Sequence, residues 1–325
     1  MKICFLDSST IPYTSSDLES KNIRGAENVI IHLSRELSKL DNDVDVYNNC
    51  SENSIIENVK WSNLDKINKN ITYDVAFTNN DIKLFDKVIA KKYVAFSHSI
   101  QSIEKFIRKG QLISYLKYKP KIILLGKYHD KNRNFLLKMF GKINLQWAVD
   151  QLFLETTLDE SIIENRAIFT SRSDRNLDIL INIWKNNIFP KNKSISLYST
   201  PSDLIDNNYN IFSRKFDNKK SMVRDLLKSK VLLVPGHKGE IYCIAAEEAR
   251  ELCIPIVTLG IGSLNERVKH GITGFVAKNY DEFAYYTLKI FDDEILWKSL
   301  RNNLIKMRGT KKWSTVAINL LKEIQ

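Results

Sequence analysis

With 325 residues, of which 43% are hydrophobic and 27% charged, the chain exceeds the size at which one hydrophobic core usually stops growing, so two domains are expected. It has no apolar run near the roughly 18 residues that a membrane-spanning helix needs, and its start, MKICFLDSST, lacks the regions of a signal peptide. The sequence therefore predicts a soluble, cytoplasmic protein. Its four cysteines are scattered without C-x-x-C spacing, which argues against a disulfide framework and a thiolate zinc site.

The first half of the sequence alternates short apolar runs with helical patterns. Apolar side chains recur at helical spacing over 25–40, which predicts a helix there. Strands are predicted at 2–7, 43–47, 74–78, 93–98 and 121–126. Short strands separated by helices imply right-handed βαβ crossovers and a parallel sheet.

The net charge of +11 is concentrated in this first half. Residues 105–142 contain 11 lysines and arginines and one acid, Asp130. The stretch 103–121 mixes lysines with apolar and aromatic side chains, as an amphipathic segment lying on a surface does. One hypothesis is that 103–142 docks on an anionic membrane surface at the inner membrane face. The alternative is a solvated helix that packs through its apolar stripe.

A second series of the same unit follows a junction near 150–165. Its strands are predicted at 166–171, 194–199, 231–235, 255–259 and 274–277, and its helices at 176–187 and 243–253. The predicted domains are 1–155 and 156–305, with a terminal helical segment in 306–325. In doubly wound sheets, ligands bind beyond the carboxyl ends of the strands, at helix N-termini.

The stretch GEIYCIAAEEARELCIPIV, residues 239–257, places two glutamates at that edge. Glu240 lies in the loop after the strand 231–235, and Glu248 lies on the helix that follows. Free amides at a helix N-terminus suit a diphosphate, while carboxylates accept hydrogen bonds from sugar hydroxyls. A pair of glutamates at this spacing ordinarily lies on a solvated helix face. The position of this pair between two buried strands instead favours a role in ligand binding.

This stretch resembles the signature of the retaining GT-B glycosyltransferases of group 1, the family 4 type: Glu240, seven residues, Glu248-Ala249, then Pro255-Ile256-Val257. Further matching segments cover nearly the whole chain, at 24–47, 96–99, 147–153, 170–184 and 260–284. The resemblance implies an α/β, GT-B architecture with two Rossmann-like doubly wound domains facing a central cleft. It also implies that the terminal helix packs back on the first domain.

The resemblance further implies roles for individual residues. Glu240 would lie close to the transferred sugar and Glu248 would hydrogen-bond the ribose hydroxyls. His98 would contact the donor sugar, although a buried core histidine at a strand end is the alternative. Arg175, in preference to Arg172, would neutralise the departing diphosphate.

The remaining donor-binding residues implied by the resemblance are Gly25, Tyr242, Cys243, Ile244 and Glu266. A glycine at position 25 would let the first loop approach the phosphates closely. Glu266 would bind either a loop backbone or the donor. The chain departs from the family pattern at Ile241 and Cys243, where glycines are usual.

Together these features predict a retaining transfer of a sugar from a nucleotide-sugar donor to a hydroxyl of a glycan, a lipid-linked acceptor or a surface polysaccharide precursor. No metal, no cofactor and no nucleic acid partner are expected. A nucleotide-sugar epimerase of the same fold, an inactive homologue that only binds the donor and a basic nucleic-acid-binding protein without enzyme activity are the alternatives.

Overall fold

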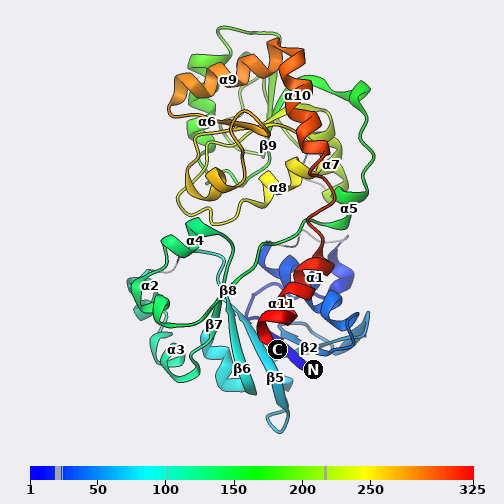
Figure 1. Ribbon diagram of the computed structural model, residues 1–325, viewed down its shortest axis with the longest axis vertical. Coiled ribbons are helices and arrows are strands. Elements are labelled where there is room, and N and C mark those ends of the chain that lie inside the picture. Colours follow the sequence, from blue (N-terminus) through cyan, green and yellow to red (C-terminus); the bar gives the residue numbers. More distant parts are fainter. Residues whose placement is uncertain (19–22, 24, 101, 216–217) are drawn as a thin grey trace. The chain divides into compact units, whose positions relative to one another are not determined.

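The computed structural model divides the chain into two α/β units (Figure 1). It describes residues 1–18, 23, 25–100, 102–215 and 218–325. Unit 1 consists of Met1–Trp147 and Trp313–Gln325, and unit 2 of Ala148–Lys312. The sequence prediction divides the domains after 155, whereas the structure divides them before Ala148. The reason is that the side chains of Val149 and Phe153 are buried in the core of unit 2.

Unit 1 is built on an eight-stranded sheet in the order β3-β4-β2-β1-β5-β6-β7-β8. All neighbouring strands are parallel except β3, which pairs with β4 in the antiparallel direction. The strands are β1 (Lys2–Leu6), β2 (Asp43–Asn48), β3 (Ser54–Ile56), β4 (Val59–Asn63), β5 (Thr72–Asn79), β6 (Ile89–Phe96), β7 (Lys121–Leu124) and β8 (Lys142–Asn144). The five predicted strands of this half are present, and the structure adds β3, β4 and β8.

The helices of unit 1 cover both faces of its sheet. The α-helices are α1 (Gly25–Ser38), α2 (Ile103–Arg108), α3 (Leu112–Tyr118), α4 (Lys127–Lys131) and α11 (Trp313–Ile324). Short 3₁₀ turns are η1 (Ser15–Leu18), η2 (Leu64–Lys66), η3 (Ile82–Lys87) and η4 (Phe135–Met139). Among the described residues, no helix has both the length and the apolar character that crossing a bilayer requires.

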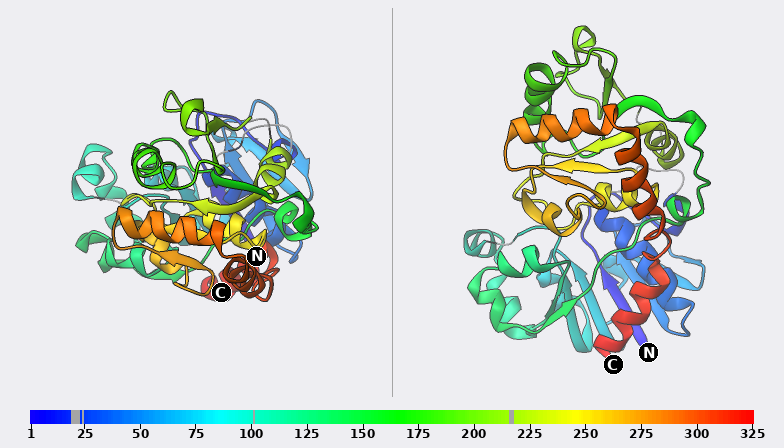
Figure 2. Two further views of the ribbon diagram at one scale, coloured as in Figure 1. Left: turned by 90° about the horizontal axis from the view of Figure 1, so that it is seen from above. Right: turned by 45° about the horizontal axis from the view of Figure 1, so that its top comes forward.

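Alternating side chains of the central strands point to opposite faces of this sheet. On one face, the ring of Phe77 stacks on those of Phe5 and Phe96, with centroids 4.7 and 5.4 Å apart. The ring series continues through Trp147 to Trp313 on α11, which contacts α1 (Figures 1 and 2). On the other face, Cys4 and Leu6 share a core cluster with residues of α2 and α3. The terminal helix is thus part of the core of unit 1.

Unit 2 has a six-stranded parallel sheet in the order β11-β10-β9-β12-β13-β14. Its strands are β9 (Glu164–Phe169), β10 (Ser196–Ser199), β11 (Ile211–Ser213), β12 (Ser229–Leu233), β13 (Ile256–Thr258) and β14 (Gly274–Val276). Its α-helices are α5 (Gln151–Glu155), α6 (Leu177–Ile183), α7 (Lys219–Leu227), α8 (Ile244–Glu251), α9 (Tyr280–Asp292) and α10 (Glu294–Ile305). A π-helical turn, η6 (Trp184–Ile188), extends α6, and 3₁₀ turns occur at η5 (Glu160–Ile162), η7 (Asn207–Tyr209) and η8 (Gly262–Glu266).

Two buried clusters lie on the two faces of this second sheet. Leu233 and Val257 belong to the cluster that includes residues of α6, α9 and α10. Leu232 and Ile256, their neighbours in sequence, belong to the cluster that includes residues of α5, α7 and α8. In Figure 2 the orange helices α9 and α10 cover the first of these faces. The predicted doubly wound α/β architecture is therefore confirmed, and the loops after β9, β12 and β13 leave the sheet at one edge.

Candidate active site

Glu240 lies in the loop between β12 and α8, and its carboxylate is held at the start of α8. Its Oε1 accepts a hydrogen bond of 3.0 Å from the backbone N–H of Cys243, the N-cap residue of α8. The backbone N–H of Glu240 donates to the carbonyl oxygen of His237 at 2.9 Å. A carboxylate at this place is favoured because the N-terminus of a helix carries free amides and a partial positive charge.

The loop that carries Glu240 packs tightly against the loop after β13. The N–H of Ser263 donates to the carbonyl oxygen of Glu240 at 2.9 Å. Gly262, with a φ of 76°, lies so close that a Cβ atom there would be 2.4 Å from the oxygen of His237. In the other direction, a Cβ on Gly236 would be 2.5 Å from the oxygen of Ile261. Both glycines are therefore required by the contact between the two loops.

Arg175, in the loop after β9, reaches the loop between β12 and α8 that carries Glu240. Its Nη1 lies 3.0 Å from Nδ1 of His237, and it would also lie 3.0 Å from a Cβ on Gly239. The next residue, Asn176, adopts a left-handed conformation and donates from Nδ2 to the carbonyl oxygen of Gly236 at 2.5 Å. The structure therefore brings Arg175 to the loop that positions Glu240.

Arg172 differs from Arg175 in its surroundings. Its side chain is 74% exposed and forms two hydrogen bonds to the carboxylate of Asp174. The pKa of the Arg172 guanidinium is raised, mainly by Asp174 and to a smaller extent by the charge of Glu240. Arg172 is thus near Glu240 but is already paired, at the outer end of the loop.

Glu248 lies half-buried on α8 among groups from distant parts of unit 2. Burial raises the pKa of its carboxyl to about 7, and the charge of Asp150 adds to this, whereas Lys219 and Arg214 act in the opposite direction. Nζ of Lys219 is 2.6 Å from Oδ2 of Asp150. Arg214, directly after β11, is bonded through Nε to Asp225, while its buried Nη1 has no hydrogen-bond partner within the described part of the chain.

The resemblance implies that Tyr242, Cys243 and Ile244 bind the donor, but the first two of these side chains are buried. The guanidinium of Arg267 lies 4.2 Å over the buried ring of Tyr242. Burial raises the pKa of the Cys243 thiol, and the backbone amide of Cys243 is already bonded to Glu240. Ile244 is exposed at the first turn of α8. The side chains of Tyr242 and Cys243 thus pack inside unit 2, and only Ile244 presents its side chain at the surface.

Two further predicted donor-binding residues are Glu266 and Gly25. Glu266 ends η8, the turn that packs against the Glu240 loop, and is half-buried. In unit 1, Gly25 is the first residue of α1 and is exposed, and a Cβ atom there would meet nothing within 4 Å. No contact within the described chain therefore requires glycine at position 25.

His98 follows β6 in unit 1. Its backbone N–H donates to Oδ1 of Asn80 at 3.2 Å, and its ring lies 6.3 Å from that of Trp147. Burial, together with the nearby His129, lowers the pKa of His98 to about 4, so the imidazole is neutral at physiological pH. Its Nε2 has no hydrogen-bond partner among the described residues. A neutral ring with one unused nitrogen can donate to or accept from a ligand hydroxyl.

Sequence reasoning missed several residues around the glutamates. His237 stands three positions before Glu240, in GHKGE, and could have been noticed as a polar side chain in the same loop. Asp150, Lys219 and Arg214 had no such signal, because they reach Glu248 from three separate elements. No group of three or more His, Cys, Asp or Glu arranged to hold a metal ion occurs in the described part of the chain.

Replacing Gly262 tests the contact between the two loops. Gly262→Ala should lower the melting temperature more than Gly271→Ala does. Both substitutions force a left-handed residue, which costs about 1–2 kcal/mol, but only the first adds a clash, since a Cβ on Gly271 meets nothing within 4 Å. Thermal unfolding of both variants measures the difference, and equal melting temperatures would contradict the proposed packing.

The environment of Glu248 predicts a specific pH dependence of stability. Its pKa is about 7 in the folded chain against an ordinary 4.5, so the folded state binds more protons between these values. The free energy of unfolding should therefore fall as the pH rises from about 5 to about 8, and Glu248→Gln should reduce that fall. Urea unfolding of both proteins across this range checks the prediction, and parallel pH profiles would show that the carboxyl is not desolvated.

Comparisons with known proteins show which family and which fold the chain is similar to. Residues 202–307, which include Glu240, Glu248 and Glu266, match the family described as Glycosyl transferases group 1. No curated protein matches the chain. Among solved structures, Alr3699/HepE of Anabaena in complex with UDP-glucose is similar at a TM-score of 0.73 and 14% identity, over 100% of this chain and 99% of that one.

Two other similar structures have related descriptions. Sucrose-phosphate synthase (tll1590) from Thermosynechococcus elongatus has a TM-score of 0.72 at 10% identity, over 99% of this chain and 98% of that one. WaaG, a glycosyltransferase involved in lipopolysaccharide biosynthesis, has a TM-score of 0.68 at 12% identity, over 99% of both chains. The resemblance seen in the sequence is confirmed to this extent: residues 202–307 match the family model of the glycosyl transferases of group 1, and the chain has the GT-B fold.

Proposed function

We propose that the protein is a retaining glycosyltransferase that moves a sugar from a nucleotide-sugar donor to an acceptor hydroxyl. The observation that carries this proposal is the arrangement at the edge of the unit 2 sheet. There, Arg175, the N-terminus of α8 and the carboxylate of Glu240 converge through two interlocked loops, and the group 1 match spans both loops.

The donor diphosphate would bind where the positive groups are. Arg175 supplies a full charge, and the first turn of α8 supplies backbone dipoles. When the bond between the sugar and the diphosphate breaks, negative charge develops on the departing phosphate oxygen. Fixed positive groups lower this barrier because they need no reorganisation at the moment of reaction. Glu240, held beside them, would contact the transferred sugar.

Glu248 would hydrogen-bond the ribose hydroxyls of the donor. Its carboxyl can do so in either protonation state, because the protonated form keeps acceptor capacity and gains an O–H donor. The similarity to a structure that contains UDP-glucose makes UDP-sugars the first donors to test.

The acceptor is proposed to be a glycan, a lipid-linked acceptor or a surface polysaccharide precursor. The similarity to a transferase of lipopolysaccharide biosynthesis supports this class. His98, with its neutral imidazole and unused Nε2, would hydrogen-bond a hydroxyl of the donor sugar. We further propose that transfer retains the anomeric configuration and needs no metal ion.

Kinetics of the two glutamate variants test the assignment. Glu240→Gln should lower kcat by about 10²-fold with little change in donor affinity, since it removes a charge near the reacting centre. Glu248→Ala should weaken donor binding by about tenfold, the value of one good hydrogen bond to a charged group. Turnover with UDP-sugars, donor binding by calorimetry and the product anomer by NMR are the measurements.

Two controls belong to this experiment. Incubation with donor alone reveals an epimerase, because that reaction needs no acceptor. Addition of EDTA should leave the rate unchanged if transfer is independent of metal. Unchanged kinetics in both variants, with melting temperatures like that of the parent chain, would contradict the assignment.

We also propose that unit 1 docks on an anionic membrane surface through 103–142. Phe106 and Tyr115 pack into the core of unit 1, whereas neighbouring apolar side chains are exposed to solvent: Ile107, Ile113, Leu116, Phe135 and Met139. These exposed side chains share their segment with 11 basic residues. Apolar insertion and charge attraction would therefore act together at one surface.

Vesicle binding tests this surface. Ile113 and Leu116 are 79% and 52% exposed, so the double substitution Ile113→Glu with Leu116→Glu should leave the fold intact. It should weaken binding to anionic vesicles by at least about tenfold, because burying two such side chains is worth a few kcal/mol. Ile295→Glu, at an 84% exposed position of α10 in unit 2, is the control. Equal, negligible sedimentation with neutral and anionic vesicles would end the membrane hypothesis.

A further inference from the structure

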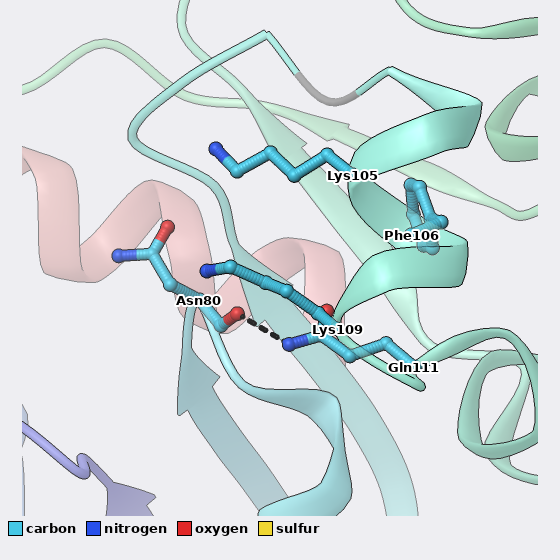
Figure 3. A pocket seen from close by; sticks show the side chains of 5 residues that line it. All are labelled: Asn80, Lys105, Phe106, Lys109 and Gln111. Atoms are coloured by element: carbon cyan, nitrogen blue, oxygen red, sulfur yellow. Dashed lines mark hydrogen bonds between the residues drawn. The ribbon is translucent and has the colours of Figure 1, made fainter.

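A small hollow in unit 1 lies beside the loop that carries His98. It is lined by Asn80, Lys105, Phe106, Lys109 and Gln111, and Figure 3 shows the two lysine side chains extending from α2 toward Asn80. The space inside it amounts to about 10 Å³, enough for one oxygen atom or water molecule, and the hollow opens to solvent. Any ligand would therefore place one polar atom inside and keep its bulk at the mouth.

The basic residues of this hollow lack the carboxylate partners that other lysines of the segment have. Lys117 pairs with Asp86 at 2.6 Å, and Lys142 pairs with Asp130 at 2.7 Å. Within the described residues, no ion pair is formed by Lys105, Lys109 or their neighbour Arg108, and Glu104 of the same helix is exposed. The nearest acid in the hydrogen-bond network is Asp81, whose Oδ1 accepts from Nε2 of the lining residue Gln111 at 3.3 Å. The hollow thus gathers positive charge that no ion pair within the described residues neutralises.

These cations are also close to one another. Burial, then Lys109, then Arg108 lower the pKa of the Lys105 ammonium. Like charges at this distance raise the free energy of the empty site, and an anion between them would remove that repulsion. The lysine ammonium is a compact charge with three N–H donors that can rotate. It can therefore bind a phosphate or carboxylate oxygen without the fixed geometry that an arginine requires.

The polar wall of the hollow is fixed by several hydrogen bonds. Asn80, in a left-handed conformation, accepts a bond from Gln111 Nε2 at its carbonyl oxygen, 3.0 Å away and dashed in Figure 3. Its Oδ1 accepts from the backbone of His98, and Nζ of Lys105 donates to Oγ of Ser99 at 2.6 Å. The hollow and the His98 loop are therefore one connected structure.

We propose that this hollow binds an oxyanion, a phosphate or carboxylate group, that the acceptor carries. One oxygen would enter the hollow beside Asn80, and Lys105 and Lys109 would hold the others at the mouth. The identification with an acceptor group rests on the proposed function, whereas oxyanion binding itself does not. It would make acceptor choice depend on a negative charge in addition to the sugar hydroxyls.

Titration of inorganic phosphate into the full chain, by calorimetry at low ionic strength, tests the site. Saturable binding is expected, and Lys105→Gln with Lys109→Gln should weaken it by at least about tenfold. Lys131→Gln with Lys138→Gln removes the same charge from two exposed positions outside the hollow, and should change the affinity by less than about twofold. Equal losses in both pairs, or no saturable binding by the parent chain, would overturn the proposal.

Lysine footprinting locates the anion without relying on a variant. Acylation of the parent chain, read by mass spectrometry, should be slowed by phosphate at Lys105 and Lys109 but not at Lys131 and Lys138. Uniform slowing at all four, or none, would show that phosphate acts only as a general counterion.

A last comparison separates the two sources of the oxyanion. If phosphate displaces the chain from vesicles of anionic lipid, the hollow takes a lipid headgroup. If vesicle binding persists while a soluble sugar phosphate competes with phosphate, the group belongs to a glycan. Because neither readout uses the donor, oxyanion binding can fail while sugar transfer by unit 2 stands, and the reverse also holds.

Discussion

The position of Glu240 depends on a steric fit between two loops of unit 2. Gly236 and Gly262 each lie where a Cβ atom would collide with the backbone of the other loop, and both have positive φ. This close approach lets the backbone of Glu240 accept a hydrogen bond from Ser263 while its side chain reaches the amide of Cys243. Since the parallel strands β12 and β13 fix where these loops begin, the sheet itself sets the geometry of the site.

Positive groups approach Glu240 from two sides. The carboxylate is favoured by the N-terminus of α8, and Arg175 approaches from the loop after β9 through His237. Arg175 forms no ion pair with Glu240 among the described residues; its ion-pair partner is Asp174, whose Oδ1 lies 3.9 Å from Nε. The same carboxylate forms two shorter hydrogen bonds with Arg172, so Arg175 is the less tightly paired of the two cations and the more readily available to a diphosphate.

Local sequence patterns predicted those strands and helices that have a long enough apolar run or a clear helical spacing. Apolar runs such as 231–235 and 255–259 predicted β12 and β13, and the terminal helical segment predicted in 306–325 contains α11. The strands β3, β4, β8 and β11 were not predicted. β13 and β14 are as short as β3, β8 and β11, but they lie within the apolar runs 255–259 and 274–277, which gave the signal. The sequence placed the glutamates on a loop and a helix, but it could not reveal that Cys243 would be left-handed and buried.

Long-range contacts account for what the sequence did not predict around Glu248. Lys219 and Asp150 lie 69 positions apart and meet only because α5 and α7 pack on one face of the unit 2 sheet. Burial is the largest influence on the pKa of the Glu248 carboxyl, whereas the charges act in both directions: Asp150 raises the pKa, and Lys219 and Arg214 lower it. A group whose protonation is set by burial, and not by one partner, responds to anything that changes its hydration. A donor ribose at Glu248 would change both the hydration and the hydrogen bonds of its carboxyl, so donor binding and protonation at this position would be thermodynamically linked.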